Sequence, residues 1–321
     1  MRWSPQRYLA VFLLVAGVVG LAYRAIDRGV TSLHCLAQPP AGHFLAFCLS
    51  PQFGDFEHGA YYYKLEPEAL AHFRRADVIF FGSSREQIAL STQAFRDFFG
   101  EQRIAPYLFG FGYNEQAAFP LALVQREQPK PKAIVVLADP FFQDRSTPHV
   151  RVNQWVRWRV VPEFYEFAQK KLFIAIGASI CRLWPDRCTP EPQLVFRSKQ
   201  DGAWLLHNFD HSAASPVGGG AFFTFTEAMA APDLPFAEKF IAATGVPRDC
   251  VILSAAPTNS MRAEGYVKEM GRLLGVKVAL PVLENLSVSD GSHLTPESAE
   301  RWSTALLADM RDTFARCAGK H

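Results

Sequence analysis

The sequence VIFFGSSREQIALS, residues 78–91, predicts a buried strand that ends in a turn and is followed by a helix. Its first four residues are β-branched or aromatic, as in a strand covered on both faces, and Gly82 ends the run. Two adjacent hydroxyl groups, those of Ser83 and Ser84, stand at the junction, and Arg85 follows them. Because a serine at such a turn is a candidate nucleophile, the stretch also raises the question of which hydroxyl takes part in chemistry.

Strands and helices alternate along most of the remaining chain. Short apolar segments predict further strands, among them LFGFG at residues 108–112, AIVVL at residues 133–137 and CVILS at residues 250–254. Amphipathic segments between them predict helices, the last over residues 295–318. The alternation predicts an α/β fold with a central parallel sheet covered on both faces. Ligands of such sheets bind beyond the carboxyl ends of the strands. The segments at those ends are residues 82–85, 110–114, 139, 257–260 and 288–293.

We divide the chain into three parts. Residues 1–30 form a membrane anchor or signal peptide, residues 31–66 a linker, and residues 67–321 the catalytic domain. The linker is rich in proline, glycine, histidine and aromatic residues, so we expect irregular structure there. Residues from about 141 to 231 interrupt the alternation and predict a helical insertion. Within it, residues 173–184 are too short to span a bilayer, which favours a core or interfacial helix.

The N-terminal segment has the features of an export or anchoring sequence. Arg2 and Arg7 precede an uncharged run over residues 8–23. As a helix, this run would extend roughly 24 Å, slightly less than a hydrocarbon core of about 30 Å. Flanking aromatic residues could extend the span by anchoring at the interfaces. Because no polar region follows the apolar run, we favour an uncleaved transmembrane helix with the N-terminus inside. A cleaved signal peptide is the alternative, because residues 20–22 form a small-x-small pattern. Both interpretations place the bulk of the chain outside the cytoplasm.

The overall composition is that of a globular protein. Of the 321 residues, 49% are apolar and 20% are charged, and the formal net charge is +2. Disordered chains are poorer in apolar residues. Lysine and arginine are spread along the sequence without a basic stripe, which disfavours nucleic-acid binding.

The cysteines also suit an exported protein. There are six, they form no CxxC pair, and no histidine lies at ligand spacing, so we expect no metal site. An even number in an oxidising compartment predicts disulfides. Proximity favours Cys35–Cys48 and Cys181–Cys188, which leaves Cys250–Cys317. Several free, buried cysteines are the alternative.

A serine becomes a nucleophile when a base accepts its proton, and that base is usually a histidine oriented by a carboxylate. Of the nine histidines, only His293 lies in a compact polar loop with an aspartate three residues before it, in SVSDGSHLTPESA at residues 287–299. Thr295 and Pro296 predict the start of a helix directly after the loop. Asp290 and His293 are therefore candidates for an orienting carboxylate and a base. The alternative is a turn-capping Asp290 beside a surface histidine.

The combination of a serine turn after the first strand and a D-x-x-H sequence before the last helix resembles the SGNH (GDSL-type) hydrolase superfamily. The resemblance covers roughly residues 76–318, with the insertion unmatched. It implies a three-layer, flavodoxin-like fold in which Ser84 is the nucleophile, His293 the general base and Asp290 its partner. Ser83 stands where the family has an aspartate. The family reaction needs no cofactor, so we expect none.

The same resemblance implies an oxyanion hole, and here the sequence departs from the family. The backbone N–H groups of Ser84 and of Gly110 or Gly112 are the expected donors. The family's third donor is an asparagine after the third strand, where this chain has Asp139. An ionised aspartate only accepts hydrogen bonds. Asn114 is therefore a candidate for the missing donor, and a hole with two donors is the alternative.

Three further polar residues at the carboxyl ends of strands are candidates for substrate binding. Arg85 suits a carboxylate or phosphate, or an ion pair with Asp139. Asp139 suits a substrate hydroxyl, the pair with Arg85, or a cap at the strand end. Asn259 suits a substrate contact or a loop cap.

Proteins of the membrane-anchored branch, which includes DltD-like D-alanyl transfer and polysaccharide O-acylation proteins, share the G-S-S variant. The resemblance therefore implies an acyltransferase or esterase acting on O-acyl groups of a cell-envelope or secreted polysaccharide. It also implies a membrane-bound O-acyltransferase as partner, and a single-pass location in the inner membrane with the catalytic domain in the periplasm. A periplasmic carboxylesterase or lipase and a non-catalytic scaffold subunit are the alternatives.

Overall fold

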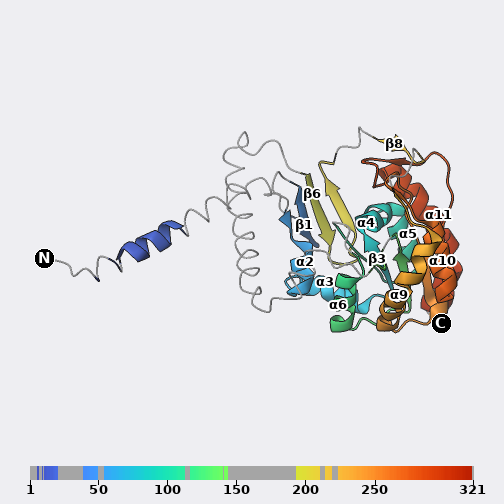
Figure 1. Ribbon diagram of the computed structural model, residues 1–321, viewed down its shortest axis with the longest axis horizontal. Coiled ribbons are helices and arrows are strands. Elements are labelled where there is room, and N and C mark those ends of the chain that lie inside the picture. The colour runs from blue at the N-terminus through green and yellow to red at the C-terminus, as the bar shows by residue number, and fades with distance from the viewer. Residues whose placement is uncertain are drawn as a thin grey trace.

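The computed structural model describes residues 6, 9, 11–20, 39–49, 54–112, 116–139, 141–143, 193–209, 214–218 and 223–319. A five-stranded sheet forms its centre, in the order β12-β10-β5-β3-β4, and all of its strand pairs are parallel (Figure 1). The strands are β3 (Val78–Ser83), β4 (Pro106–Phe111), β5 (Ala133–Leu137), β10 (Val251–Ser254) and β12 (Lys277–Val278). When these five strands are numbered by their order in the chain, their order across the sheet is 2-1-3-4-5. The direction in which strands are added reverses at the first of them, β3. The predicted α/β fold with a central parallel sheet is confirmed.

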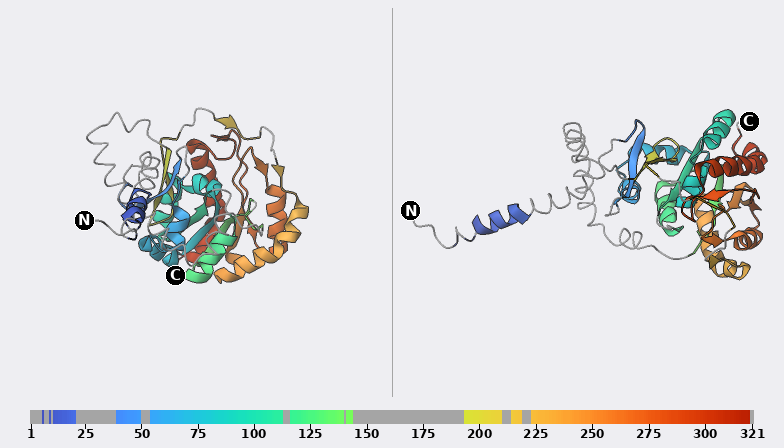
Figure 2. Two further views of the ribbon diagram at one scale, coloured as in Figure 1. Left: turned by 60° about the vertical axis from the view of Figure 1, so that its left-hand side comes forward. Right: turned by 90° about the horizontal axis from the view of Figure 1, so that it is seen from above.

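Local sequence explains both the strands and the helices around them. The four apolar residues of β3 are completely buried, as the uninterrupted apolar run predicted. Two groups of helices pack among themselves and flank the sheet (Figure 2). One group contains α4 (Ser84–Leu90), α5 (Gln93–Gln102) and α11 (Pro296–Ala318), and the other α6 (Ala118–Glu127), α9 (Ala230–Thr244) and α10 (Glu264–Leu274). A further helix, α3 (Pro67–Arg75), precedes β3. As predicted, Thr295 caps α11 and Pro296 occupies its first turn.

The predicted irregular linker is wrong for part of residues 31–66. These residues contain β1 (His43–Leu49), β2 (Gly54–Asp55) and α2 (Glu57–Tyr62). Phe44 to Cys48 are buried, because the strand is covered on both of its faces. The run HFLAFCL is a continuous apolar segment of strand length, and that signal outweighs the prolines and glycines around it.

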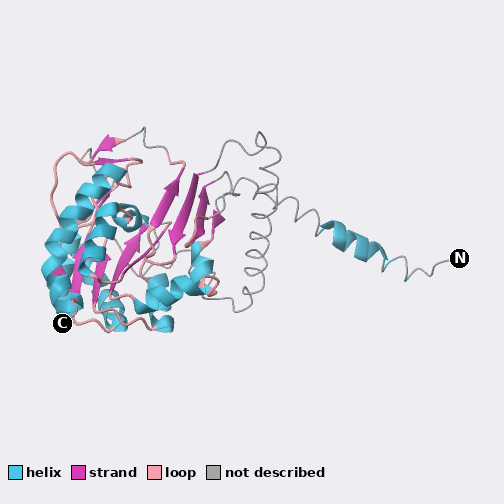
Figure 3. Cartoon of the chain, turned by 180° about the vertical axis from the view of Figure 1, so that it is seen from behind, coloured by secondary structure: helices cyan, strands magenta, loops and turns pink. Residues whose placement is uncertain are grey.

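The insertion also differs from the prediction where the structure describes it. Instead of the loop expected after the helices, β6 (Gln193–Ser198) and β7 (Trp204–His207) join β1 and β2 in an antiparallel sheet, in the order β2-β1-β6-β7. Figure 3 shows these strands beside the parallel sheet. Two short strands follow, β8 (Ser215–Pro216) and β9 (Phe223–Thr224), which pair with β13 (Ser287–Val288) and β11 (Met261–Arg262). The expected helices before residue 185 lie outside the described residues.

One buried arginine of the antiparallel sheet is bound to the parallel sheet. Arg197 of β6 is completely buried, and its Nη1 donates to Glu57 Oε2 at 2.8 Å and to the carbonyl oxygen of Gly110 at 2.9 Å. Its Nη2 donates to the carbonyl oxygen of Leu108 at 2.6 Å, and the guanidinium lies 4.9 Å from the ring centre of Tyr61. The antiparallel sheet is thereby fixed to β4, at one edge of the parallel sheet.

Residues 11–20 are helical and their side chains are exposed. In the part of the chain that is described, no helix has the length and apolar character needed to cross a bilayer, so the predicted transmembrane helix lacks support there.

The predicted disulfide between Cys250 and Cys317 is present and ties the C-terminal end of α11 to the residue before β10. Cys48 is also disulfide-bonded. The other two predicted pairs involve Cys35, Cys181 and Cys188, which lie outside the described residues.

Candidate active site

The junction between β3 and α4 gives the two adjacent serines different positions. Ser83 ends the strand, is buried, and its Oγ accepts a hydrogen bond from the N–H of Arg85 at 3.3 Å, as a helix N-cap does. Ser84 begins the helix, and its Oγ lies 2.8 Å from Nε2 of His293. The structure therefore brings only Ser84 to the candidate base.

His293 lies between that hydroxyl and a carboxylate. Its Nδ1 is 2.7 Å from Oδ2 of Asp290, while Oδ1 of Asp290 accepts the N–H groups of Ser292 and His293, both at 2.9 Å. Partial burial alone would raise the pKa of Asp290. The hydrogen bond to the His293 ring, the charge of that ring and the two backbone N–H groups lower the pKa by more, so it lies below its usual range. An ionised Asp290 fixes the proton on Nδ1, which leaves Nε2 free to accept a proton from Ser84.

The loop that carries Asp290 and His293 is a short, firmly held hairpin. Val288 and Leu294 form an antiparallel bridge, and the N–H of Ser289 donates to the carbonyl oxygen of His293 at 2.8 Å. Gly291, between them, has a φ of +76°, a conformation that glycine adopts without a steric penalty. The loop therefore presents His293 from two fixed strand ends.

Asn259 belongs to the support of this loop. Its N–H donates to the carbonyl oxygen of Gly291 at 2.9 Å. Its side-chain amide accepts from the N–H of Gly218 and donates to the carbonyl oxygen of Pro216, both at 2.8 Å. Of the two roles considered for Asn259, these contacts match the loop cap.

The two glycines expected at the oxyanion hole make other contacts, which involve the N–H of Gly112 and the carbonyl oxygen of Gly110. The N–H of Gly112 donates to Glu57 Oε1 at 3.2 Å, and the ring of Phe47 lies 2.7 Å from where a Cβ of Gly112 would stand. The carbonyl oxygen of Gly110 accepts hydrogen bonds from Arg197 and from Gln87, the latter at 3.1 Å. Asn114 lies outside the described residues.

The amide of Ser84 remains as a donor. It lies in the first turn of α4, where backbone N–H groups have no acceptor within the helix. The described contacts leave the role of oxyanion donor open to this amide.

Arg85 and Asp139 contact each other. Arg85 Nε donates to Asp139 Oδ2 at 2.7 Å and Nη2 donates to the carbonyl oxygen of Asp139 at 2.6 Å. Both residues are buried, with 4% and 3% of their surface exposed. Burial raises the pKa of Asp139, and the charge of Arg85 opposes that rise without cancelling it. Of the partners considered for Asp139, the structure selects Arg85.

The sequence analysis missed a group of charged residues beneath the site. Glu57, Glu86 and Arg197 are all completely buried, and they come from α2, α4 and β6. The carboxyl group of Glu86 lies so close to Gly110 that any Cβ at that position would overlap it. Burial raises the pKa of Glu86 well above its ordinary value; Glu57 and Asp139 raise it further, and Arg197 opposes them. Folding therefore favours the protonated form of the Glu86 carboxyl group. The sequence feature that could have indicated Glu86 is a glutamate in the first turn of a helix that follows a buried strand.

The raised pKa of Glu86 predicts a pH-dependent stability. A carboxyl group whose pKa is raised by folding keeps its proton in the folded state at a pH where the unfolded chain has lost it. The free energy of unfolding therefore falls as the pH rises above 4.5, the ordinary pKa of a glutamate. One retained proton corresponds to a slope of at most about 1.4 kcal/mol per pH unit. We expect Glu86→Gln, which is permanently neutral, to be less sensitive to pH than the wild type and more stable at pH 8. Urea unfolding at pH 5 and pH 8 measures this, and identical slopes for both proteins would contradict it.

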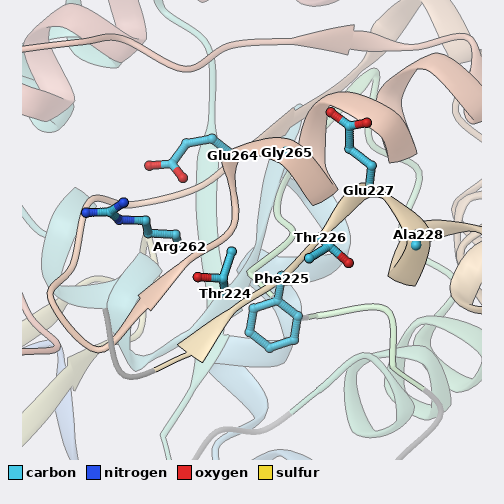
Figure 4. A pocket seen from close by; sticks show the side chains of 8 residues that line it. All are labelled: Thr224, Phe225, Thr226, Glu227, Ala228, Arg262, Glu264 and Gly265. Atoms are coloured by element: carbon cyan, nitrogen blue, oxygen red, sulfur yellow. The ribbon is translucent and has the colours of Figure 1, made fainter. Parts of the chain in front are cut away.

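A separate pocket of about 420 Å³ lies where β9 and β11 meet the start of α10 (Figure 4). Its walls include Phe225, Arg262 and Glu264 but neither Ser84 nor His293. Within the described ranges, no cluster of three or more histidine, cysteine, aspartate or glutamate side chains is arranged to hold a metal ion.

Comparison with protein-family models, with curated proteins and with solved structures finds no match for this chain. The chemistry of the site is therefore inferred from its residues and their geometry.

Proposed function

We propose that the protein is a serine acyltransferase or esterase of the SGNH type. The observation that carries the proposal is the continuous chain of hydrogen bonds from Ser84 Oγ through the His293 ring to Asp290, at 2.8 and 2.7 Å. These are the distances at which a base activates a serine and a carboxylate orients the base. The strand order 2-1-3-4-5, with Ser84 after the strand where the order reverses, supports the flavodoxin-like form of the fold.

In the proposed reaction, Ser84 Oγ forms a bond to the carbonyl carbon of an ester while its proton moves to Nε2 of His293. The electron pair of the carbonyl π bond moves to the oxygen. When the resulting tetrahedral intermediate collapses, the bond to the leaving alkoxide breaks and His293 returns the proton to it. Asp290 stabilises the imidazolium during both steps. Water or a sugar hydroxyl, deprotonated by His293, then attacks the acyl-enzyme and releases Ser84.

The substrate class and location are proposed on the sequence resemblance. We infer that the acyl groups belong to a cell-envelope or secreted polysaccharide, and that a membrane-bound O-acyltransferase is the partner. The disulfide between Cys250 and Cys317 supports an oxidising compartment outside the cytoplasm. The exposed apolar side chains of residues 11–20 support attachment to the inner membrane through the N-terminal segment.

A fluorophosphonate probe, which reacts with activated serines, tests the proposal directly. We expect the wild type to be labelled and Ser84→Ala to remain unlabelled. Ser83→Ala is the matched control, since it removes the neighbouring hydroxyl and only a helix cap, and we expect it to be labelled. Failure to label the folded wild type would favour the non-catalytic scaffold. Faster turnover of a simple aryl ester than of an acetylated glycan would favour the carboxylesterase.

A further inference from the structure

The proposed reaction leaves an electrostatic requirement that the predicted donors do not meet. As Ser84 attacks, negative charge develops on the carbonyl oxygen, and donors aimed at that oxygen lower the barrier. The N–H of Gly112 is bound to Glu57, and Asp139 has only acceptor oxygens when ionised. Ser84 itself contributes one backbone donor. A further donor near the carboxyl ends of β3 and β5 would add to the stabilisation of this charge.

The register of the sheet shows which group lies there. In the pairing of β3 with β5, Phe81 lies opposite Val136. Ser84 comes three residues after Phe81, and Asp139 comes three residues after Val136. Neighbouring strands lie about 4.8 Å apart. Because the guanidinium of Arg85 is bound to both the carboxylate and the carbonyl oxygen of Asp139, it is held at the end of β5, the strand beside the one that precedes the nucleophile.

The guanidinium has a donor to spare. Nε and Nη2 of Arg85 are directed at Asp139, and among the described residues no acceptor is bound to Nη1. A guanidinium is planar, so two bonds to Asp139 fix the direction of the remaining N–H groups. Arg85 is therefore a preorganised cation next to Ser84.

We propose that Arg85 stabilises the oxyanion of the reaction through Nη1, and that Asp139 is the positioning residue that orients it. This inference rests on the proposed function. In chemical terms, Arg85 carries its positive charge before and after each step, and no proton is transferred to or from it. Only 4% of the surface of Arg85 is exposed. In an environment with so little water, a fixed charge acts more strongly than in solvent. At the position of Asp139, the SGNH family has an asparagine whose side-chain amide donates to the oxyanion. In this chain the guanidinium of Arg85 takes the place of that amide.

Steady-state turnover of an acyl ester by Arg85 variants tests this. We expect Arg85→Ala to lower kcat by about 10²- to 10³-fold with a smaller change in KM, which is the typical loss for one oxyanion donor. Arg85→Lys keeps the charge but not the fork, and we expect it to recover part of the loss. Added guanidinium at millimolar concentration is expected to raise kcat of Arg85→Ala at least tenfold and to leave Ser84→Ala inactive. Asp139→Asn is expected to lower kcat less than Arg85→Ala does.

Thermal unfolding of each variant separates catalysis from folding. A folded Arg85→Ala protein with wild-type kcat, or one whose lost activity guanidinium does not restore, overturns the role of Arg85. Absence of turnover and of probe labelling in the wild type instead overturns the proposed function on which it rests.

Discussion

Replacing His293 with alanine is expected to lower kcat by about 10⁴- to 10⁶-fold while the protein stays folded. Its Nε2 is the group 2.8 Å from Ser84 Oγ, so the variant has no acceptor for the serine proton and no donor for the leaving group. The side chain is only partly buried, with 22% of its surface exposed, and its removal opens no large cavity in the core. Single-turnover kinetics with an acyl ester measure the loss.

Two further variants make that experiment specific. Asp290→Asn keeps the shape of the side chain but no longer favours the proton on Nδ1, and we expect a loss of about 10⁴-fold. His72→Ala, in α3, removes an imidazole remote from the site, and we expect wild-type kcat. Wild-type kcat in His293→Ala would show that Ser84 is not activated through this histidine.

The second large effect concerns stability. We expect Arg197→Ala to lower the free energy of unfolding by about 3–5 kcal/mol, because removing one partner leaves a buried charge without compensation. Glu57 would lose its cation, and the carbonyl oxygens of Leu108 and Gly110 would lose hydrogen bonds inside the core. Urea unfolding followed by circular dichroism measures the change.

An exposed ion pair provides the control for that experiment. Arg272 and Glu269 are hydrogen-bonded on the surface of α10, where solvent screens their interaction, and we expect no measurable change in stability for Arg272→Ala. The double variant Arg197→Met with Glu57→Leu removes both buried charges, and we expect it to be more stable than Arg197→Ala alone. Equal stabilities of Arg197→Ala and the wild type would mean that the sheets are held together without this arginine.

The features that the sequence predicted well depend on neighbours in the chain. The apolar run of β3, the glycine that ends it and the cap of α11 are local patterns, and the structure has each of them. Asp290 and His293 are three residues apart, so a turn suffices to bring their side chains together. Their contact with Ser84 follows from the α/β alternation, which brings the ends of distant strands to one edge. Their catalytic roles stay predictions until activity is measured.

The features that the sequence missed depend on distant partners. Arg197 has the same local sequence character as an exposed arginine, and its burial becomes visible only when β6 lies beside β1 and β4. Glu57 was assigned to a linker, although it accepts the N–H of Gly112 at the end of β4. Gly112 is one of the two glycines expected to supply an oxyanion donor, and the residue that binds its N–H comes from outside the predicted catalytic domain.

The pairing of β1 with β6 has a consequence for the order in which the chain folds. His43 is paired with Ser198, so the N-terminal strand is synthesised long before its partner. The strands β3, β4 and β5 follow one another closely and close short loops, and contacts of this kind form fastest. We therefore expect β3, β4 and β5 to associate first and β1 to dock late, with its apolar side chains uncovered in the interval. During synthesis, this uncovered strand is a segment at which a chaperone would bind.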